Sequence, residues 1–295
     1  SMEILDLQTG AWVYTQFVMG GTVGGPIGGV TRQRYAHVSV TLPDNAILNI
    51  GGYWSGTNDT ADLYWPATLG NGSQGTTQFT GSLMACPRDA HTATLLTTGY
   101  GQGNVVVIGG ERDDFVFQPL CIDTAEIYDH QQHVPTTALN GTQGVFAPMG
   151  MSMFFKRCDH TATLLTNGKI LVTGGWTVSP TTGFHQGSQQ RTAEILDPYG
   201  LGYNVNAPFA GIDQTGKFDW TRDPQGNQTT LSNYWTGVAQ HSATILNDGR
   251  VLLAGGQDFR PAGYAPGWGP PFPAAPPFGW PGHAVSTTLA SLYYP

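Results

Sequence analysis

Four histidines each begin a short apolar segment that ends in a Gly-Gly pair, and they are the residues best suited to metal chemistry. They are His37, His91, His160 and His241. If the four segments are equivalent strands of a repeated fold, the imidazoles surround one mouth of a central channel. Neutral imidazoles that converge on an axis suit a divalent metal. Alternatively, each histidine hydrogen-bonds the backbone of a neighbouring repeat and recurs because the fold recurs, which requires no cofactor.

A basic and an acidic series accompany the histidines. Three histidines follow an arginine by three residues, and a later segment of the same repeats has an acidic residue at a fixed position. These residues are Arg34, Arg88 and Arg157, and Asp62, Glu126 and Glu194. A ring of guanidinium groups would suit carboxylates or sulfated glycans. Ion pairs between strands explain both series at once, and we therefore expect them. The fourth repeat has Val238 in place of the arginine.

Aromatic residues in two long inserts are the candidates for ligand binding. The Pro-rich insert 259–283 and the insert 197–238 contain, respectively, Trp268, Phe272, Phe278 and Trp280, and Trp220 and Trp235. Proline lowers the entropy that the first insert loses on binding, and the rings offer flat apolar faces to sugar rings or to a protein. The alternative is that such a long loop covers one face or plugs an incomplete sheet edge.

The elements that position these residues are short strands joined by tight turns. Each repeat has a strand, a polar turn, a strand ending in Gly-Gly, a loop and a third strand of the type Thr-Ala-Glu-Ile-Tyr. Asn167-Gly168 and Asp248-Gly249 supply the positive φ that two-residue hairpins need. No stretch has the apolar period of a helix, which indicates an all-β chain. We place the repeats of one domain near residues 31–85, 86–150, 155–235 and 236–295.

One stretch, residues 157–198, contains the complete repeat. It reads Arg-x-x-His-Thr-Ala-Thr-Leu-Leu, then Asn-Gly-Lys-Ile-Leu-Val-Thr-Gly-Gly, then Thr-Ala-Glu-Ile-Leu-Asp-Pro. This combination resembles the kelch repeat in its bacterial and galactose-oxidase-like form, and four copies cover essentially the whole chain. The resemblance implies a β-propeller with the histidine strand innermost, the Gly-Gly strand second, the acidic strand third and a strand often bearing Trp outermost. It indicates the fold and not the activity, because propellers host many unrelated functions.

The two ends of the chain bear on how the ring closes. The N-terminal strands, within residues 2–18, read as the third and fourth strands of a blade, while the C-terminus supplies three strands of the last blade. Pairing the two ends avoids an open sheet edge. We therefore expect a four-bladed kelch-type propeller in which the strand from Trp12 to Phe17 completes the last blade. The alternatives are a displaced strand, a piece of a larger propeller, or two chains that share blades.

The fourth copy, from Gln240 to Gly256, also looks like the stretch that carries copper ligands in copper radical oxidases of the galactose and glyoxal oxidase type. Those enzymes have a tyrosine immediately before the ligand histidine. The corresponding residues here are Ala36, Ala90, Asp159 and Gln240. Without the phenolate, one-electron chemistry has no protein radical. A copper-dependent or other metal-dependent oxidase that uses the channel histidines is therefore the alternative function.

The amino-acid composition argues against two classes of partner, nucleic acids and membranes. Only 11% of the residues are charged, with 12 Lys and Arg against 20 Asp and Glu, so the basic footprint that nucleic acids require is missing. No apolar run approaches the roughly 20 residues of a transmembrane helix. We expect neither nucleic-acid binding nor membrane insertion.

The sequons, together with the low charge and the polar uncharged loops, indicate a secreted glycoprotein. Sequons of the type Asn-x-Ser/Thr occur in predicted loops, at Asn58, Asn71, Asn140 and Asn227. Three cysteines, Cys86, Cys121 and Cys158, lack the spacing of a zinc site and allow one disulfide plus a free thiol.

The sequence predicts a non-catalytic recognition module that binds carbohydrate or a protein through loops on one propeller face. A structural fragment that self-associates into a homo-oligomer is the further alternative.

Overall fold

The structure is a computed structural model, and the residues it describes form strands, turns and bends but no helix, in agreement with the all-β prediction. The described residues are 3–5, 12–14, 34–53, 58–66, 76–99, 101–113, 119–133, 143–177, 191–200, 216–231, 237–261, 282–286 and 290–294.

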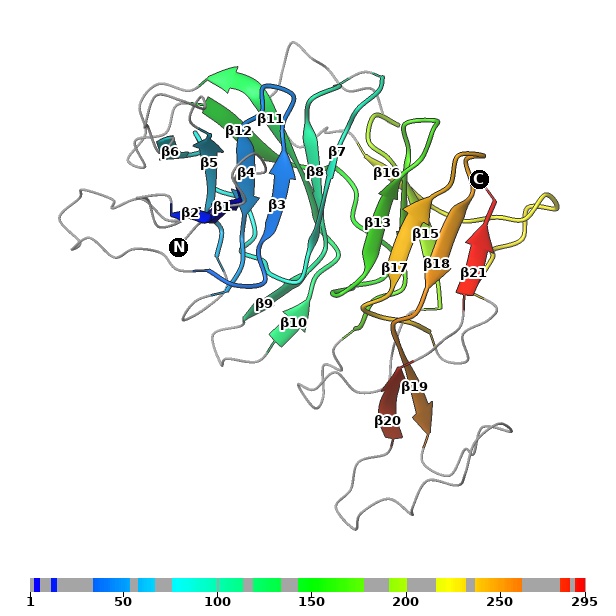
Figure 1. Cartoon of the computed structure of the whole chain (residues 1–295). Helices are drawn as coiled ribbons and strands as arrows, with labels where there is room; N and C mark the ends of the chain where they lie inside the picture. Colours follow the sequence, from blue (N-terminus) through cyan, green and yellow to red (C-terminus); the bar gives the residue numbers. More distant parts are fainter. Residues whose placement is uncertain are drawn as a thin grey trace.

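Four antiparallel sheets form the blades of a four-bladed β-propeller, as predicted (Figure 1). Blade 1 contains β3 (Val38–Thr41), β4 (Ile47–Ile50), β5 (Ala61–Trp65) and β6 (Thr76–Phe79). Blade 2 contains β7 (Thr92–Leu95), β8 (Val105–Ile108), β11 (Ala125–His133) and β12 (Gln143–Pro148). Blade 3 contains β13 (Thr161–Leu164), β14 (Ile170–Thr173), β15 (Ala193–Asp197) and β16 (Lys217–Trp220). Blade 4 contains β17 (Ser242–Ile245), β18 (Val251–Ala254) and β21 (Ala290–Tyr293).

The order of strands within a blade follows the repeat. The histidine strand lies at one edge of each sheet, the Gly-Gly strand is second and the acidic strand third, and in blades 1 to 3 a fourth strand pairs with the third. The histidine strands β3, β7, β13 and β17 contact one another in chain order.

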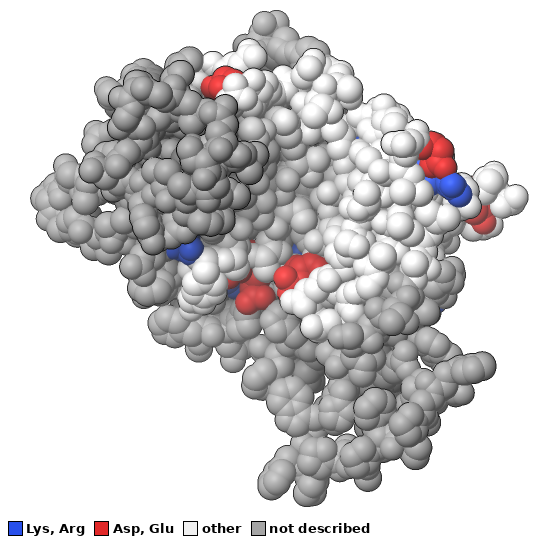
Figure 2. Space-filling model, in the orientation of Figure 1, with Lys and Arg blue, Asp and Glu red and all other residues white. Residues whose placement is uncertain are grey.

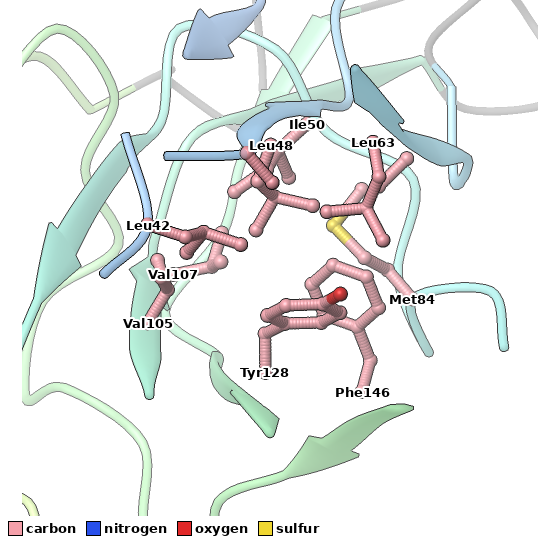
Figure 3. Close-up of a cluster of buried hydrophobic side chains, with 11 residues drawn as sticks. Leu42, Leu48, Ile50, Leu63, Met84, Val105, Val107, Tyr128 and Phe146 are labelled. Carbon is pink, nitrogen blue, oxygen red and sulfur yellow. The ribbon is translucent and has the colours of Figure 1, made fainter. Parts of the chain in front are cut away.

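The hydrophobic core consists of layers between blades, because a blade alone cannot cover both of its faces. Between blades 1 and 2, Leu48 and Ile50 pack against Val107, Tyr128 and other apolar residues (Figure 3). Similar clusters fill the interfaces between blades 2 and 3 and between blades 3 and 4. Alternate residues of a second strand therefore serve the two neighbours, as in β8, where Val105 and Val107 belong to one cluster and Val106 and Ile108 to the other.

The Gly-Gly pairs are required by the approach of the next blade. Gly109 has a φ of +56°, and a Cβ on it would lie 2.6 Å from the carbonyl oxygen of Arg157 and 2.8 Å from Cε1 of His160. The N–H of Gly110 donates to that same carbonyl oxygen at 3.0 Å. Only glycine gives both the left-handed conformation and the space.

Two further hairpins extend from the blades. β9 (Glu111–Asp113) pairs with β10 (Pro119–Cys121), and β19 (Gln257–Pro261) pairs with β20 (Gly282–Ser286). Each follows the Gly-Gly pair of its blade, and Figure 1 shows both below the inner strands. They lie at the end of the blades where the histidine strands begin.

The predicted closure of the last blade by the N-terminal strands is wrong for the described strands. β1 (Glu3–Leu5) and β2 (Trp12–Tyr14) pair with each other, while the third place in blade 4 belongs to β21, which pairs with β18. A local hairpin closes a short loop and therefore loses less chain entropy than a pairing between the two ends. Blade 4 consequently has three strands in the described part of the chain.

Candidate functional site

The predicted metal ligands lie at the interfaces between blades. His160 Nε2 is hydrogen-bonded to Thr92 Oγ1 of blade 2 at 3.0 Å, and His241 Nε2 to Thr161 Oγ1 of blade 3 at 2.9 Å. In both pairs the hydroxyl belongs to the first residue of the preceding histidine strand. These two histidines therefore join neighbouring blades. Their partners are side-chain hydroxyls, whereas the alternative in the sequence analysis was the backbone of the neighbouring repeat.

Burial keeps the histidines neutral near physiological pH. Desolvation lowers the pKa of His91 to about 3, and the charge of Arg88 acts in the same direction. Desolvation likewise lowers the pKa of His241 to about 4. His91 differs from the others because Val38, which occupies the position of Thr92 in blade 1, has no hydroxyl. Neither ring nitrogen of His91 has a hydrogen-bond partner among the described residues.

No histidine belongs to a group that could hold a metal ion in the described part of the chain. The group found there consists of Glu111, Cys121 and Cys158, whose potential ligand atoms lie within 4.8 Å of one another. Cys121 and Cys158 form a disulfide that joins β10 to the start of blade 3, so their sulfurs are not the thiolates that bind metals. While Cys121 and Cys158 are disulfide-bonded, they and Glu111 therefore do not suit a metal ion. A metal bound by His37, His91, His160 and His241 stays a prediction.

The disulfide settles the question left open for the cysteines. One pair forms, and Cys86 is a free thiol.

The residues before the histidines all have a left-handed backbone. Their φ angles are 54° for Ala36, 46° for Ala90, 52° for Asp159 and 54° for Gln240. Backbone hydrogen bonds connect them from blade to blade, from the N–H of Asp159 to Ala90 and from the N–H of Gln240 to Asp159. None of the four carries a phenol. These positions therefore lack the tyrosine on which the resemblance to copper radical oxidases depends.

The arginines and acidic residues form the predicted ion pairs, and all of them are buried. Arg34 lies 2.9 Å from Asp62, Arg88 lies 2.6 Å from Glu126, and Arg157 lies 2.5 Å from Glu194. Each guanidinium also donates to two backbone carbonyls of its own blade, in blade 3 those of Gly174 and Thr192. These arginines are committed within the fold and do not form a ring of free cations at the channel mouth.

Blade 4 has lost both members of this pair. Val238 replaces the arginine, and Ser291 occupies the position of the acid on the third strand. Val238 is fully buried. Because a lone charge at either position would be buried without a partner, the two replacements are consistent with each other.

Trp220 is the predicted ligand-binding residue that the structure describes in detail, and it belongs to an exposed aromatic cluster. It ends β16 at the outer side of blade 3. Its ring is stacked on Phe154, with ring centres 4.3 Å apart and planes inclined by 14°, and Phe155 contacts it edge-on at 5.5 Å. Phe154 is 49% exposed and Phe155 is 38% exposed. We call these three residues the aromatic platform.

The platform is held by the buried ion pair of blade 3. The backbone N–H groups of Phe154 and Phe155 donate to the two carboxylate oxygens of Glu194, at 2.8 and 3.4 Å. Glu194 is in turn fixed by Arg157. The two phenylalanines therefore sit on a backbone anchored to the core, while their rings face solvent.

Blade 2 contains the same backbone arrangement without the rings. There the N–H groups of Ala85 and Cys86 donate to Glu126, at 2.7 and 3.1 Å. The fold therefore does not require aromatic side chains at the positions of Phe154 and Phe155. Our sequence analysis missed these two residues, although aligning the repeats at Arg88 and Arg157 would have set them against Ala85 and Cys86.

The other predicted aromatic ligands, Trp235, Trp268, Phe272, Phe278 and Trp280, lie outside the described residues. On the face shown in Figure 2, charged side chains are few and scattered over the described surface. No helix that could span a membrane was found among the described residues.

Comparison with known proteins shows similarity in fold. No protein-family model matches the sequence, and no curated protein does. Among solved structures, the chain is similar to one described as the structure of YjhT, with 15% identity over 78% of this chain and 75% of the other and a TM-score of 0.40. It is also similar to a fungal alcohol oxidase of the AA5 family in complex with copper, with 14% identity over 87% of this chain and 53% of that one and a TM-score of 0.42. The arrangement of its own four sheets makes the chain a β-propeller.

Proposed function

We propose that this protein is a recognition module that binds carbohydrate through the aromatic platform of blade 3. The observation that carries the proposal is the contrast between two blades with the same backbone. Blade 2 holds Ala85 and Cys86 where blade 3 holds Phe154 and Phe155, and both segments donate to a buried glutamate. The rings are therefore additional to what the fold needs, and exposed apolar patches on soluble proteins commonly mark interaction sites.

The chemistry of the platform suits a sugar. One face of a pyranose ring carries several C–H groups with partial positive charge, which complement the negative face of an aromatic ring. The backbone of Phe154 and Phe155 is already fixed by Glu194, so binding would order little more than side chains and lose little entropy. The low charge of the chain favours a neutral glycan over a sulfated one.

The test is a glycan array followed by calorimetric titration of the best neutral oligosaccharide. Phe154→Ala, which copies Ala85 of blade 2, and Trp220→Ala should each weaken binding at least tenfold. The matched control is Leu83→Ala, which removes another exposed apolar side chain from the linker of blade 2. Phe154→Ala should change the free energy of unfolding by only about 0.5 kcal/mol. Unchanged affinity in the Phe154 and Trp220 variants would refute the proposal.

A protein partner at the same platform is the second candidate. A flat aromatic cluster also serves protein interfaces, where Trp and Phe are enriched. An array on which no glycan binds, combined with a partner whose binding is lost in Phe154→Ala, would favour it.

An extracellular location accords with this function. The Cys121–Cys158 disulfide suits an oxidising compartment, and the sequon at Asn227 lies on an exposed turn. Reduced Cys121 and Cys158 in the protein isolated from its native source would contradict this location.

A further inference from the structure

A cavity between blades 3 and 4 is separate from the proposed carbohydrate site. Its volume is about 590 Å³, and Trp220 is not among its lining residues. Ala193 and Thr221 of blade 3 form one wall, and Leu253, Ser291 and Tyr293 of blade 4 form the other. Binding pockets for small molecules commonly have volumes of roughly 300 to 1,000 Å³. The cavity is therefore large enough for a ligand.

Blade 4 has smaller side chains than the other blades at two positions near this cavity. At the position of Ser291, each of the other blades has an acidic side chain that pairs with a buried arginine, and in blade 4 that arginine is Val238. Two large side chains are thus replaced by two small ones. Ser291 Oγ is buried and has no hydrogen-bond partner. An unpaired buried hydroxyl is costly and is a reason to expect a ligand group beside it.

Blade 2 indicates what kind of group suits the place beside Tyr293. Tyr128 occupies the same position on the third strand, and the ring of Phe146 from the fourth strand packs on it with ring centres 4.9 Å apart. Blade 4 has no fourth strand among its described residues, and Tyr293 lines the cavity. Among the described residues, none packs on Tyr293 as Phe146 packs on Tyr128.

The hydroxyl groups of the cavity argue against a sugar as its ligand. Thr221 Oγ1 donates to the carbonyl oxygen of Ala193, Thr229 Oγ1 donates to Thr221 Oγ1, and Thr173 Oγ1 is hydrogen-bonded to Thr161 and His241. A sugar ring needs several free partners in a buried site. Among the buried hydroxyls described at this cavity, that of Ser291 has no partner, and Leu231 adds an apolar side chain to the lining.

We propose that this cavity binds an aromatic ring with one hydrogen-bonding group, such as a phenol or an indole. The ring packs on Tyr293 as Phe146 packs on Tyr128, and its polar group bonds Ser291 Oγ. The ring has two plausible sources, a small aromatic compound or the Tyr or Trp side chain of a protein partner. The proposal is independent of the aromatic platform, since the two sites share no residue.

The test is ligand-detected NMR and calorimetric titration of the whole chain with phenol, indole, benzene, glucose and N-acetyl-tyrosinamide. Phenol and indole should bind saturably and more tightly than benzene. Ser291→Ala should weaken phenol about threefold to tenfold, the value of one hydrogen bond, and leave benzene unchanged. N-acetyl-tyrosinamide tighter than phenol would indicate a partner's side chain as the source, and the reverse order would indicate a small compound.

A second variant keeps the test decisive if Ser291→Ala is uninformative. The double variant Val238→Arg/Ser291→Glu installs the ion pair of the other three blades and occupies the cavity. It should abolish phenol binding while Phe154→Ala leaves that binding intact. Three results would overturn the proposal. They are phenol binding that survives the double variant, the absence of saturable binding, and tighter binding of glucose than of phenol at this site.

Discussion

Removing Glu194 is expected to destabilise the protein severely, because this carboxylate neutralises a fully buried charge. Arg157 and Glu194 are both inaccessible to solvent and lie 2.5 Å apart. Glu194→Ala leaves the Arg157 guanidinium buried without its partner, which costs about 3 to 5 kcal/mol. It also removes the acceptor of the Phe154 N–H. We expect a loss of about 4 kcal/mol out of a total stability on the order of 5 to 15 kcal/mol.

Blade 4 supplies the compensating variant. Arg157→Val/Glu194→Ser copies the residues Val238 and Ser291 and removes both charges together. We expect it to cost about 2 kcal/mol, so that the double variant is more stable than Glu194→Ala alone. The control is Lys169→Ala, which breaks the exposed pair with Asp197 at 3.3 Å and should cost less than about 0.5 kcal/mol.

Urea denaturation followed by tryptophan fluorescence and circular dichroism measures these free energies. For 295 residues, the entropy of unfolding is about 0.6 kcal/mol/K, so a loss of 4 kcal/mol corresponds to a decrease in Tm of about 6 °C. A cost below about 1 kcal/mol for Glu194→Ala, or a double variant no more stable than that single one, would refute the reasoning.

Two predictions concern the histidines. Because the folded-state pKa values of His91 and His241 lie at about 3 and 4, below the unfolded value of about 6.5, the unfolded chain binds protons first as the pH falls. Stability should therefore decrease from pH 6.5 downwards, by about 2 kcal/mol per histidine at pH 5, and His91→Gln should reduce this slope in urea titrations at several pH values; an unchanged slope would contradict it. Val38→Thr should stabilise the protein by about 1 kcal/mol by giving His91 the hydroxyl that Thr92 gives His160. Val40→Thr, two residues further along β3 and packed against the core cluster, is the control and should destabilise, and equal effects of the two substitutions would exclude the hydrogen bond as the cause.

The repeat made most of the fold predictable. The Gly-Gly pairs follow from a steric need that recurs in all four blades, the arginines and their acids follow from an electrostatic need that recurs in blades 1 to 3, and ion pairs such as Arg88–Glu126 form as expected. The closure of the ring was predicted wrongly because the pattern of Glu3–Leu5 identifies a third strand but not the sheet to which it belongs. Sequence patterns do not rank a local hairpin against a pairing of distant ends.

The candidate sites were less predictable because they depend on departures from the repeat. Trp220 was predicted because it is an aromatic residue in a long insert. The rings that contact it, Phe154 and Phe155, lie far from it in sequence. Ser291 lines the cavity and Val238 belongs to the core cluster between the same two blades, and their joint replacement is recognised only when both are known to lie at one interface. Repetition thus predicts what the blades share, and three-dimensional contacts are needed to interpret where they differ.

The contact of each histidine with the preceding blade has a consequence for how such a protein could be recombined. His160 fits Gly109 and Thr92, which both belong to the repeat before its own. The unit that repeats in the sequence therefore differs from the unit that packs in space, because each such junction combines a histidine with residues of the preceding repeat. A transplanted blade would bring its histidine to a foreign glycine and a foreign hydroxyl position. Exchanges between propellers should succeed when the threonine, glycine and histidine of one junction travel together.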